Sequence, residues 1–338
     1  MDKREHAYAS RPGRITTRRR FLQALAVAGS TAVAPAAWAQ GYPDRPLRLI
    51  VPFPPSGSTD IVARTIAERL GAALGQNVVV DNRPGATGAI GLELLARAEP
   101  DGHTIGLGTI GSIAINPVVN SKLPWDPLRD FAPVGYVGST PFALLVNPSL
   151  EAKSVADFLA LAKRKPGQVT YATGGNGGSQ HLASVLLAEM AGVDMLHVPY
   201  KGSGPAFVDL ISGQVDAMIE PAVSAAPHIK SGKVRALALT GSKRSDAFPG
   251  LPLVADTLPG YDVSAWFALF APARTPATAI ERLNRELGTI LRDPQVVARL
   301  AEVGVDVAPA SAAQLGSFLK DEIGKWREVV KKANIAGN

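Results

Sequence analysis

The 338-residue chain contains no cysteine. Disulfides, thiolate nucleophiles, iron–sulfur clusters and cysteine-bound zinc are therefore excluded. The histidines beyond the first 39 residues lie far apart, with neither an HExxH motif nor a tight His-x-His pair. They are His103, His181, His197 and His228. We expect no metal site and no cofactor.

Motifs of several enzyme classes are also missing. No GxSxG turn and no GxxxxGK[ST] loop occurs, so the strongest signals of a serine hydrolase or a nucleotide triphosphatase are absent. Residues 106–111 match GxGxxG, but they lie in the third strand unit, and Pro117 shortens any helix that follows. We expect no dinucleotide site and no catalytic residue.

Little net charge remains once the N-terminal segment is set aside. The formal charge is +6, and residues 1–39 hold seven Lys or Arg against two Asp or Glu. The rest keeps 28 of the 35 basic residues and 27 of the 29 acidic ones. No basic stripe with interleaved aromatic residues is left, so we expect no nucleic-acid partner.

The N-terminal segment has the pattern of an export signal. Arg18, Arg19 and Arg20 precede an Ala-rich apolar run over residues 21–34, which is too short to span a bilayer. The small residues around Trp38 predict cleavage between Ala39 and Gln40, and a periplasmic protein. The paired arginines resemble a twin-arginine (Tat) signal, which exports folded proteins. A plain Sec signal and an Arg-rich organelle transit peptide are the alternatives.

Apolar strands and amphipathic helices alternate along the mature chain. The 299 residues after the leader are enough for two lobes. Val62, Ile66, Leu70 and Leu74 recur at helical spacing after a Gly/Ser turn. Such strand, helix, strand order predicts parallel sheets with crossover helices. The elements expected in the first part are strands at 47–53, 78–80 and 103–107 and helices at 62–74 and 90–98.

A second group of strands follows an irregular, Pro-rich stretch at 117–146, within which a strand restarts at 142. We predict an α/β fold of two lobes, each a mostly parallel sheet flanked by helices, with a ligand cleft between them. The predicted lobes are residues 40–141 with 260–338, and residues 142–259. The later elements are strands at 169–172, 195–199, 215–219 and 234–239, and helices at 154–163, 179–191, 205–212, 222–231, 276–292 and 312–333.

Four Gly/Ser/Thr-rich turns join a strand to a helix, two in each predicted lobe. They span residues 55–60, 83–88, 173–179 and 201–205. The first N–H groups of a helix lack internal partners and sit at the positive end of its dipole, so such turns can hold a carboxylate or phosphate. Helix capping alone explains any one turn. Their repetition in both halves favours an anion-binding cleft.

Each of four ionisable residues near these turns has two possible roles. Asp60 fits a first-turn cap, or a contact to a ligand ammonium or water. His181 fits a ligand contact or ordinary packing. Lys201 fits an anion partner or plain exposure. Glu220 ends a buried strand and fits either a ligand contact or a hinge salt bridge.

Several short motifs resemble a known family, the extracytoplasmic solute receptors of the tripartite tricarboxylate transporters, also called Bug-type receptors. The likeness covers nearly all of the mature chain. It rests on PFPP at 52–55 with Ser58, Thr59 and Asp60, on NRPGA at 82–86 with Gly88, on YATG at 171–174 with His181, on VPYKGSGP at 198–205 and on LFAP at 269–272.

The resemblance implies a two-lobed, type II periplasmic-binding-protein fold that closes on a small carboxylate and delivers it to the permease subunits of the transporter. It implies a receptor rather than an enzyme, and we expect a monomer. Two positions depart from the family pattern. Ser56 stands where glycine is common, and Glu220 stands where aspartate is common. The expected ligand-binding residues are Phe53, Ser56, Ser58, Thr59, Asp60, Thr87, Gly88, Thr109, Ser112, Gly174, Asn176, Ser179, His181, Lys201, Gly202, Ser203 and Glu220.

Two other functions remain open at this point. An exported, cofactor-dependent oxidoreductase would fit a twin-arginine route, although the usual ligands of cofactors are missing. A receptor that reports to a membrane sensor kinase would share the fold and differ only in its output.

Overall fold

The structure is a computed structural model of the whole chain that describes residues 41–245 and 248–332. The predicted export signal and its cleavage before Gln40 lie outside these residues. The described residues from 42 onward form one compact unit. Within the described part, no helix combines the length and apolar character needed to cross a membrane.

The first strands are parallel, as predicted. Strand β1 (Leu47–Val51) lies between β2 (Val78–Asn82) and β3 (Thr104–Thr109). Helix α2 (Ser58–Leu74) and helix α3 (Ala89–Ala96) form the crossovers. The expected apolar stripe of α2 is confirmed, because its residues at helical spacing are buried. The helix ends where Gly75 adopts φ 69°, a conformation that favours glycine.

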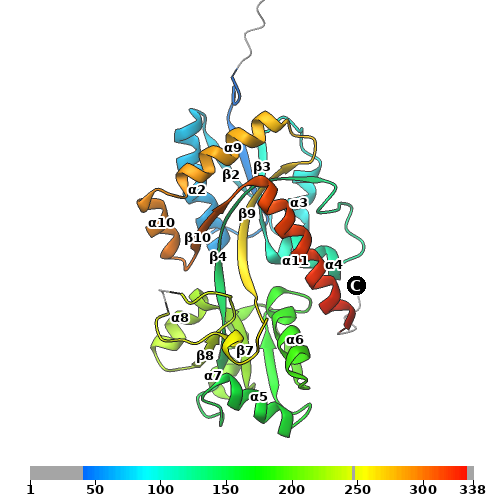
Figure 1. Cartoon of the computed structure of the whole chain (residues 1–338), viewed down its shortest axis with the longest axis vertical. Helices are drawn as coiled ribbons and strands as arrows, with labels where there is room; N and C mark the ends of the chain where they lie inside the picture. Colours follow the sequence, from blue (N-terminus) through cyan, green and yellow to red (C-terminus); the bar gives the residue numbers. More distant parts are fainter. Residues whose placement is uncertain (1–40, 246–247, 333–338) are drawn as a thin grey trace, which may run out of the picture. The chain divides into compact units, whose positions relative to one another are not determined.

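Two long strands run through the middle of this unit. Strand β4 (Phe131–Val146) pairs antiparallel with β9 (Ser264–Pro272), and the two lie side by side in Figure 1. The sequence predicted an irregular stretch over most of β4. Its prolines and glycines interrupt the period of two, and the strand absorbs them with register shifts between Pro133 and Gly135 and between Tyr136 and Gly138.

A second set of strands continues the sheet beyond β4. Strand β5 (Thr170–Thr173) pairs in parallel with β6 (Leu196–Pro199) and β7 (Ala217–Pro221). Strand β8 (Arg235–Leu239) runs in the same direction as these strands, as expected, but it does not pair with them: β4 lies between β8 and β7 and is antiparallel to both. The full order is β2-β1-β3-β9-β4-β7-β5-β6, with β8 and β10 attached to β4. Four helices belong to this half: α5 (Val155–Arg164), α6 (Ser179–Ala191), α7 (Ser203–Ser212) and α8 (Ala222–Lys230).

The C-terminal helices pack against the first half of the sheet. Helix α9 (Ala277–Ile290) contacts α2 and β4, and α10 (Pro294–Ala301) contacts α2. Strand β10 (Asp306–Ala310) pairs antiparallel with β4, and α11 (Ala312–Lys332) packs on β4 and also reaches α6. Buried Glu322 of α11 accepts hydrogen bonds from the indoles of Trp266 and Trp326. The short elements are η1 (Ala86–Gly88), η2 (Ile110–Ile115), α4 (Asn116–Val119) and η3 (Val254–Asp256).

The architecture is the predicted α/β fold, with two lobes joined by the long strands. β4 leaves β9 at the pair Pro141–Ser264 and joins β7 at the pair Phe142–Pro221. One strand therefore belongs to both halves of the sheet. The carboxyl ends of β1, β3 and β5 carry the loops from which a ligand site can be built.

Candidate functional site

A pocket of about 420 Å³ lies where loops of the two sheet halves meet. Its walls come from the loop after β1, the starts of α2 and α6, η1, the end of β3, and the crossing region of β4, β7 and β9. None of the described residues that line it carries a charge. They are Phe53, Ser58, Thr59, Thr87, Thr109, Ile110, Gly111, Thr140, Phe142, Gly174, Gly175, Asn176, Gly178, Ser179, Gln180, Pro221, Ala265, Trp266 and Phe267.

Two helix starts from different halves of the sheet share this pocket. Helix α2 begins after Gly57 and α6 after Gly178, and both N-cap glycines are extended. No side chain caps either helix. Their first N–H groups therefore have neither an intrahelical nor a side-chain acceptor. The start of η2 differs, since Thr109 and Ser112 form a reciprocal capping box there.

The sequence-predicted residues divide into two groups in the structure. Eight line the pocket: Phe53, Ser58, Thr59, Thr87, Thr109, Gly174, Asn176 and Ser179. Nine do not: Ser56, Asp60, Gly88, Ser112, His181, Lys201, Gly202, Ser203 and Glu220. Most of the second group contact the lining turns from behind, so they shape the pocket rather than face it.

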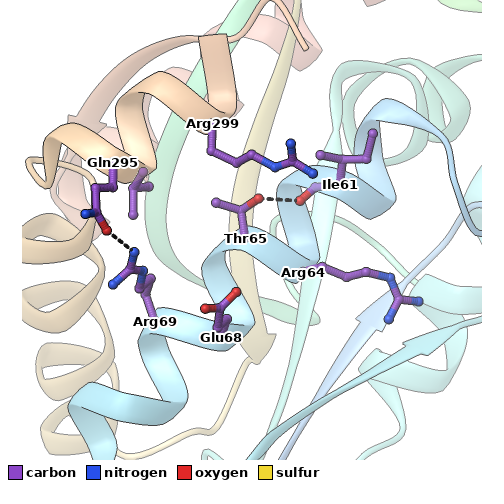
Figure 2. A pocket seen from close by; sticks show the side chains of 8 residues that line it. Ile61, Arg64, Thr65, Glu68, Arg69, Gln295 and Arg299 are labelled. Atoms are coloured by element: carbon purple, nitrogen blue, oxygen red, sulfur yellow. Dashed lines mark hydrogen bonds between the residues drawn. The ribbon is translucent and has the colours of Figure 1, made fainter. Parts of the chain in front are cut away.

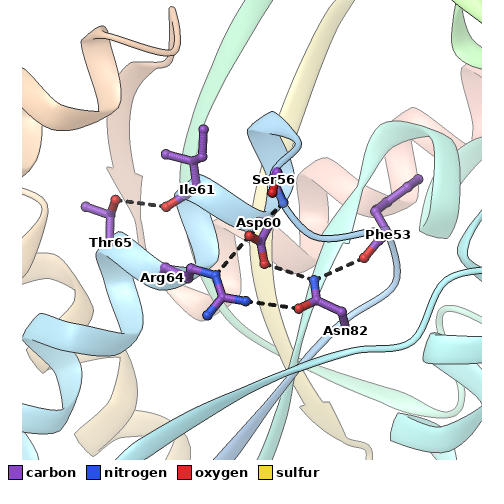
Figure 3. A network of polar contacts seen from close by, with 7 residues as sticks. All are labelled: Phe53, Ser56, Asp60, Ile61, Arg64, Thr65 and Asn82. Atoms are coloured by element: carbon purple, nitrogen blue, oxygen red, sulfur yellow. Dashed lines mark hydrogen bonds and ion pairs between the residues drawn. The ribbon is translucent and has the colours of Figure 1, made fainter.

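Asp60 is the centre of a network behind the first turn (Figure 3). Its side chain is almost fully buried, and Oδ2 accepts hydrogen bonds from Ser56 N and Arg64 Nε at 2.9 Å each. Oδ1 accepts from Asn82 Nδ2, which also donates to the carbonyl of Phe53. Burial alone would raise the pKa of Asp60, but hydrogen bonds from Arg64, Ser56 and Asn82 outweigh it and lower that pKa. Asp60 thus holds the turn that places Phe53.

Ser56 and Gly88 have left-handed backbones in the first lobe's turns. Ser56 has φ 71°, which is costly for a serine, and its N–H is held by Asp60. Gly88 has φ 89°, and a Cβ there would lie 2.7 Å from Cβ of Ser112. Ser112 itself hydrogen-bonds Thr109. A larger residue at position 88 would overlap Ser112 of η2, so only glycine fits there. This close approach of η1 to η2 places Thr87 in the pocket wall.

Two stacked histidines support the glycine-rich turn of the second lobe. The rings of His181 and His197 lie 3.9 Å apart, centroid to centroid, and nearly parallel. Nδ1 of His181 accepts from Gly177 N at 3.1 Å, and Nε2 of His197 lies 2.7 Å from Thr173 Oγ1. Burial, and secondly the neighbouring His197, lower the pKa of His181 to about 4. Both rings therefore brace the turn as neutral groups.

Glu220 lies behind the pocket and is 3% exposed. Its Oε2 accepts a short hydrogen bond from Nε2 of Gln180 and another, at 2.9 Å, from Oγ of Ser203. Burial raises the pKa of Glu220 to about 7, and the bonds from Ser203 and Gln180 lower it only in part. This carboxylate lies at the start of α7, where the sequence predicted a ligand. Lys201, in the turn before α7, is exposed.

The sequence did not single out several lining residues. Gly111, Gly175 and Gly178 lie in motifs that were noticed, but were not selected. Gln180 follows Ser179 by one residue and could have been found as the second residue of α6. Ile110, the first residue of η2, also lies in a motif that was noticed. The others come from the crossing region of β4, β7 and β9, which only the fold brings together: Thr140, Phe142, Pro221, Ala265, Trp266 and Phe267.

Thr140 is a lining residue that the sequence did not single out, and its hydroxyl group is unusual. Its side chain is 4% exposed, and Oγ1 has no hydrogen-bond partner among residues 41–245 and 248–332. Buried hydroxyl groups are normally paired, because an unpaired one costs about 1 to 3 kcal/mol. Oγ1 lies 3.5 Å from the position of a Cβ built on Gly304, which is outside the pocket lining.

A second surface pocket of about 350 Å³ lies between α2 and α10 (Figure 2). Arg64, Arg69 and Arg299 line it, and each already has a partner. Arg64 binds Asp60, Arg69 binds Gln295 at 2.6 Å, and Arg299 pairs with Glu302. Because its three arginines are paired within the chain and the side chain of Asp293 already caps the start of α10, this groove is a weaker candidate for the solute site. Across the described residues, no cluster of three His, Cys, Asp or Glu could hold a metal.

The fold and the pocket are those of a solute-binding receptor, and comparison with known proteins supports this class. The family model described as "Tripartite tricarboxylate transporter family receptor" matches residues 62–335. The chain is 39% identical to Protein BugT of Bordetella pertussis over 316 residues, 93% of this chain and 97% of that protein. The chain belongs to the tripartite tricarboxylate transporter receptor family.

Solved structures agree with this assignment. One is R. palustris Rpa4515 with adipate, which is 36% identical with a TM-score of 0.76 and covers 87% of this chain and 99% of that one. Another is MatC (Rpa3494) from Rhodopseudomonas palustris with bound malate, which is 33% identical with a TM-score of 0.72 and covers 86% and 100%. The predicted family and fold are confirmed, and the family is one of periplasmic solute receptors rather than enzymes.

Proposed function

We propose that this receptor captures a small carboxylate in the 420 Å³ pocket and delivers it to the permease subunits of a tripartite tricarboxylate transporter. One observation carries the proposal: the uncapped starts of α2 and α6 face a single pocket, and none of its described lining residues is charged. Main-chain N–H groups at helix starts favour anions without any cationic side chain. The related structures with adipate and malate support a carboxylate as the guest.

The proposed contacts follow from this geometry. The N–H and hydroxyl groups of Ser58, Thr59 and Ser179 would bind the carboxylate oxygens. Thr87 and Asn176 would bind other polar atoms of the ligand. The nine sequence-predicted residues that do not line the pocket would act through the turns that they support.

Lobe closure would complete the capture. We propose lobes of residues 40–141 with 260–338, and of residues 142–259, with hinges near residues 141 and 260. The crossing of β4 between the pairs Pro141–Ser264 and Phe142–Pro221 supports these boundaries. A ligand that touches both helix starts would bind the closed form better than the open one, and so shift the equilibrium toward closure.

The proposed function also requires that the receptor is exported and that it meets the permease. The leader would be removed between Ala39 and Gln40 after export, by the twin-arginine route or by the Sec route. The closed, monomeric receptor would then meet the permease. Family membership gives no support to an exported oxidoreductase. A receptor for a sensor kinase would use the same pocket, and a transport assay in a permease deletion strain separates the two outputs.

Isothermal titration of the mature protein tests the ligand class. Monocarboxylates, dicarboxylates, tricarboxylates and aromatic acids should include at least one with a Kd in the micromolar range, while the matching amides do not bind. Equal binding of acids and amides, or no binding across the panel, would refute a carboxylate receptor.

A further inference from the structure

Gln180 lines the pocket, and a buried carboxylate, that of Glu220, holds its side chain. Its Nε2 donates to Oε2 of Glu220 and lies 3.2 Å from Oγ of Ser203. Ser203 Oγ in turn donates to Glu220. An ionised carboxylate can only accept hydrogen bonds. Glu220 therefore fixes which end of the Gln180 carboxamide carries the donors.

The other end of the carboxamide faces a different environment. Oε1 of Gln180 lies 3.1 Å from the position of a Cβ built on Gly174, which lines the pocket. Within the described part of the chain, no hydrogen bond engages this oxygen. Because both amide protons of Gln180 point toward Glu220 and Ser203, the group that remains for a ligand is an acceptor.

We propose that Glu220 is a positioning residue that turns the Gln180 carboxamide so that its oxygen faces the pocket, which selects carboxylates that also carry a hydrogen-bond donor. Such a ligand is a hydroxy acid or an amino acid rather than a plain acid. This inference rests on the proposed function, because it assumes that a carboxylate occupies the pocket.

The preference follows from one favourable and one unfavourable interaction at the oxygen of Gln180. A ligand hydroxyl or ammonium that donates to Oε1 gains one hydrogen bond, which corresponds to about a fivefold gain in affinity. A ligand that presents an oxygen acceptor at the same point meets the Gln180 oxygen and loses affinity. Glu220 never touches the ligand in this scheme and acts through Gln180.

The charged state of Glu220 decides the orientation, so the preference depends on pH. Around Glu220 lie Gln180 of α6, Ser203 of α7 and, in register on β4, Ala143. Among the ion pairs of the described residues, none involves Glu220. The ionisable residues of the surrounding elements are His181 and Glu189 on α6, Tyr171 on β5, His197 on β6, Tyr200 and Lys201 before α7, Asp209 within α7, and His228 and Lys230 near the end of α8.

Protonation of Glu220 would give it a donor that can bind the oxygen of Gln180 and turn the carboxamide over. The amide NH₂ would then face the pocket and favour plain acids. We therefore expect the preference for donor-bearing acids to be full above about pH 8 and to fall through pH 7, the region to which burial raises the pKa of Glu220.

Titration calorimetry with matched ligands tests the proposal. The probes are succinate and malate, propionate and lactate, and phenylacetate and mandelate. Wild-type protein at pH 8 should bind the hydroxy acid about fivefold more tightly in at least one pair. Gln180→Met keeps the length of the side chain but removes the acceptor. The ratio of the Kd of the plain acid to that of the hydroxy acid should then fall below about twofold. Glu220→Gln can donate or accept, so it should lower the ratio in the same way and abolish its pH dependence.

Controls separate this proposal from the broader one. Glu151→Gln removes an exposed carboxylate far along the chain and should leave the ratio unchanged. If Glu220→Gln does not fold, Ser203→Ala removes one of the two groups that anchor Gln180 and should lower the ratio partly. Tight binding with equal affinities in all pairs, or a ratio that survives in Gln180→Met, would overturn this inference alone. No binding by any acid would overturn the carboxylate receptor itself.

Discussion

The backbone N–H of Ser56 donates a hydrogen bond to Oδ2 of Asp60 at 2.9 Å, and this bond fixes a serine whose φ is 71°. The same carboxylate is bound by Asn82, which holds the carbonyl of Phe53. A buried side chain outside the pocket therefore determines the shape of one of its walls.

Replacement of Asp60 by asparagine should destabilise the protein. The new NH₂ group would face either the Ser56 N–H or the Asn82 NH₂, so two donors would meet in a buried place. We expect a loss of about 1 to 3 kcal/mol in the free energy of unfolding, measured in urea. Arg64→Met removes the half-exposed partner of the same carboxylate and should cost less than about 1 kcal/mol. Equal losses would contradict the central role of Asp60.

Acid should weaken the fold through the stacked histidines. The pKa of His181 is lowered to about 4, whereas an unfolded histidine titrates near 6.5. Between these values the unfolded chain binds more protons, so stability decreases as pH falls from about 6.5 to 4. The contribution is on the order of 3 kcal/mol.

The variant His181→Gln can still accept from Gly177 but cannot titrate in this range. Its melting temperature should therefore fall less steeply than that of the wild type between pH 6.5 and 4. His228→Gln, on helix α8, serves as the control and should keep the wild-type slope. The same slope in His181→Gln as in the wild type would show that another group is responsible.

Gly174→Ala should reduce ligand affinity more than stability. The added Cβ would lie 3.1 Å from Oε1 of Gln180 in the pocket wall, so Gln180 must move. We expect about a tenfold rise in Kd, or about 1.4 kcal/mol. Gly204→Ala, in helix α7 and outside the pocket lining, is the matched control, because its Cβ would meet nothing within 4 Å. An equal rise in Kd for both variants would argue against a role for the position of Gln180.

Gly202 was among the ligand-binding residues expected from the sequence. In the structure Gly202 does not line the pocket, but it has φ 100°. Gly202→Ala should therefore lower stability by about 1 to 2 kcal/mol. Its Kd should stay within about twofold of wild type, as calorimetry beside a urea titration would show.

Gly304 and Val223 form a tight contact between the segment after α10 and helix α8. A Cβ on Gly304 would lie 1.8 Å from Cγ2 of Val223, and φ at Gly304 is 67°. Gly304→Ala should cost about 2 to 4 kcal/mol from overlap and backbone strain together. In a Val223→Ala background the same change should cost about 1 to 2 kcal/mol less. Additive losses in the double-mutant cycle would mean that the two residues do not touch.

Local patterns predicted most of the helices and the parallel strands. Helix α2 is an example, because Val62, Ile66 and Leu70 repeat at helical spacing and Gly75 ends the run. The long strand β4 was missed over its first eleven residues. Its prolines and glycines obscure the alternation, and only pairing with β9 holds it extended.

The sequence by itself determined the family, the α/β class, the glycine-rich turns and eight of the residues that line the pocket. These follow from short-range rules of helix capping and apolar spacing, which act over a few neighbouring residues. Only the tertiary structure decided that Asp60, His181 and Glu220 support the turns from behind, and that Thr140 and Gln180 line the pocket. The direction of each of these side chains depends on partners distant in sequence, and the crossing of β4 and β9 creates those contacts.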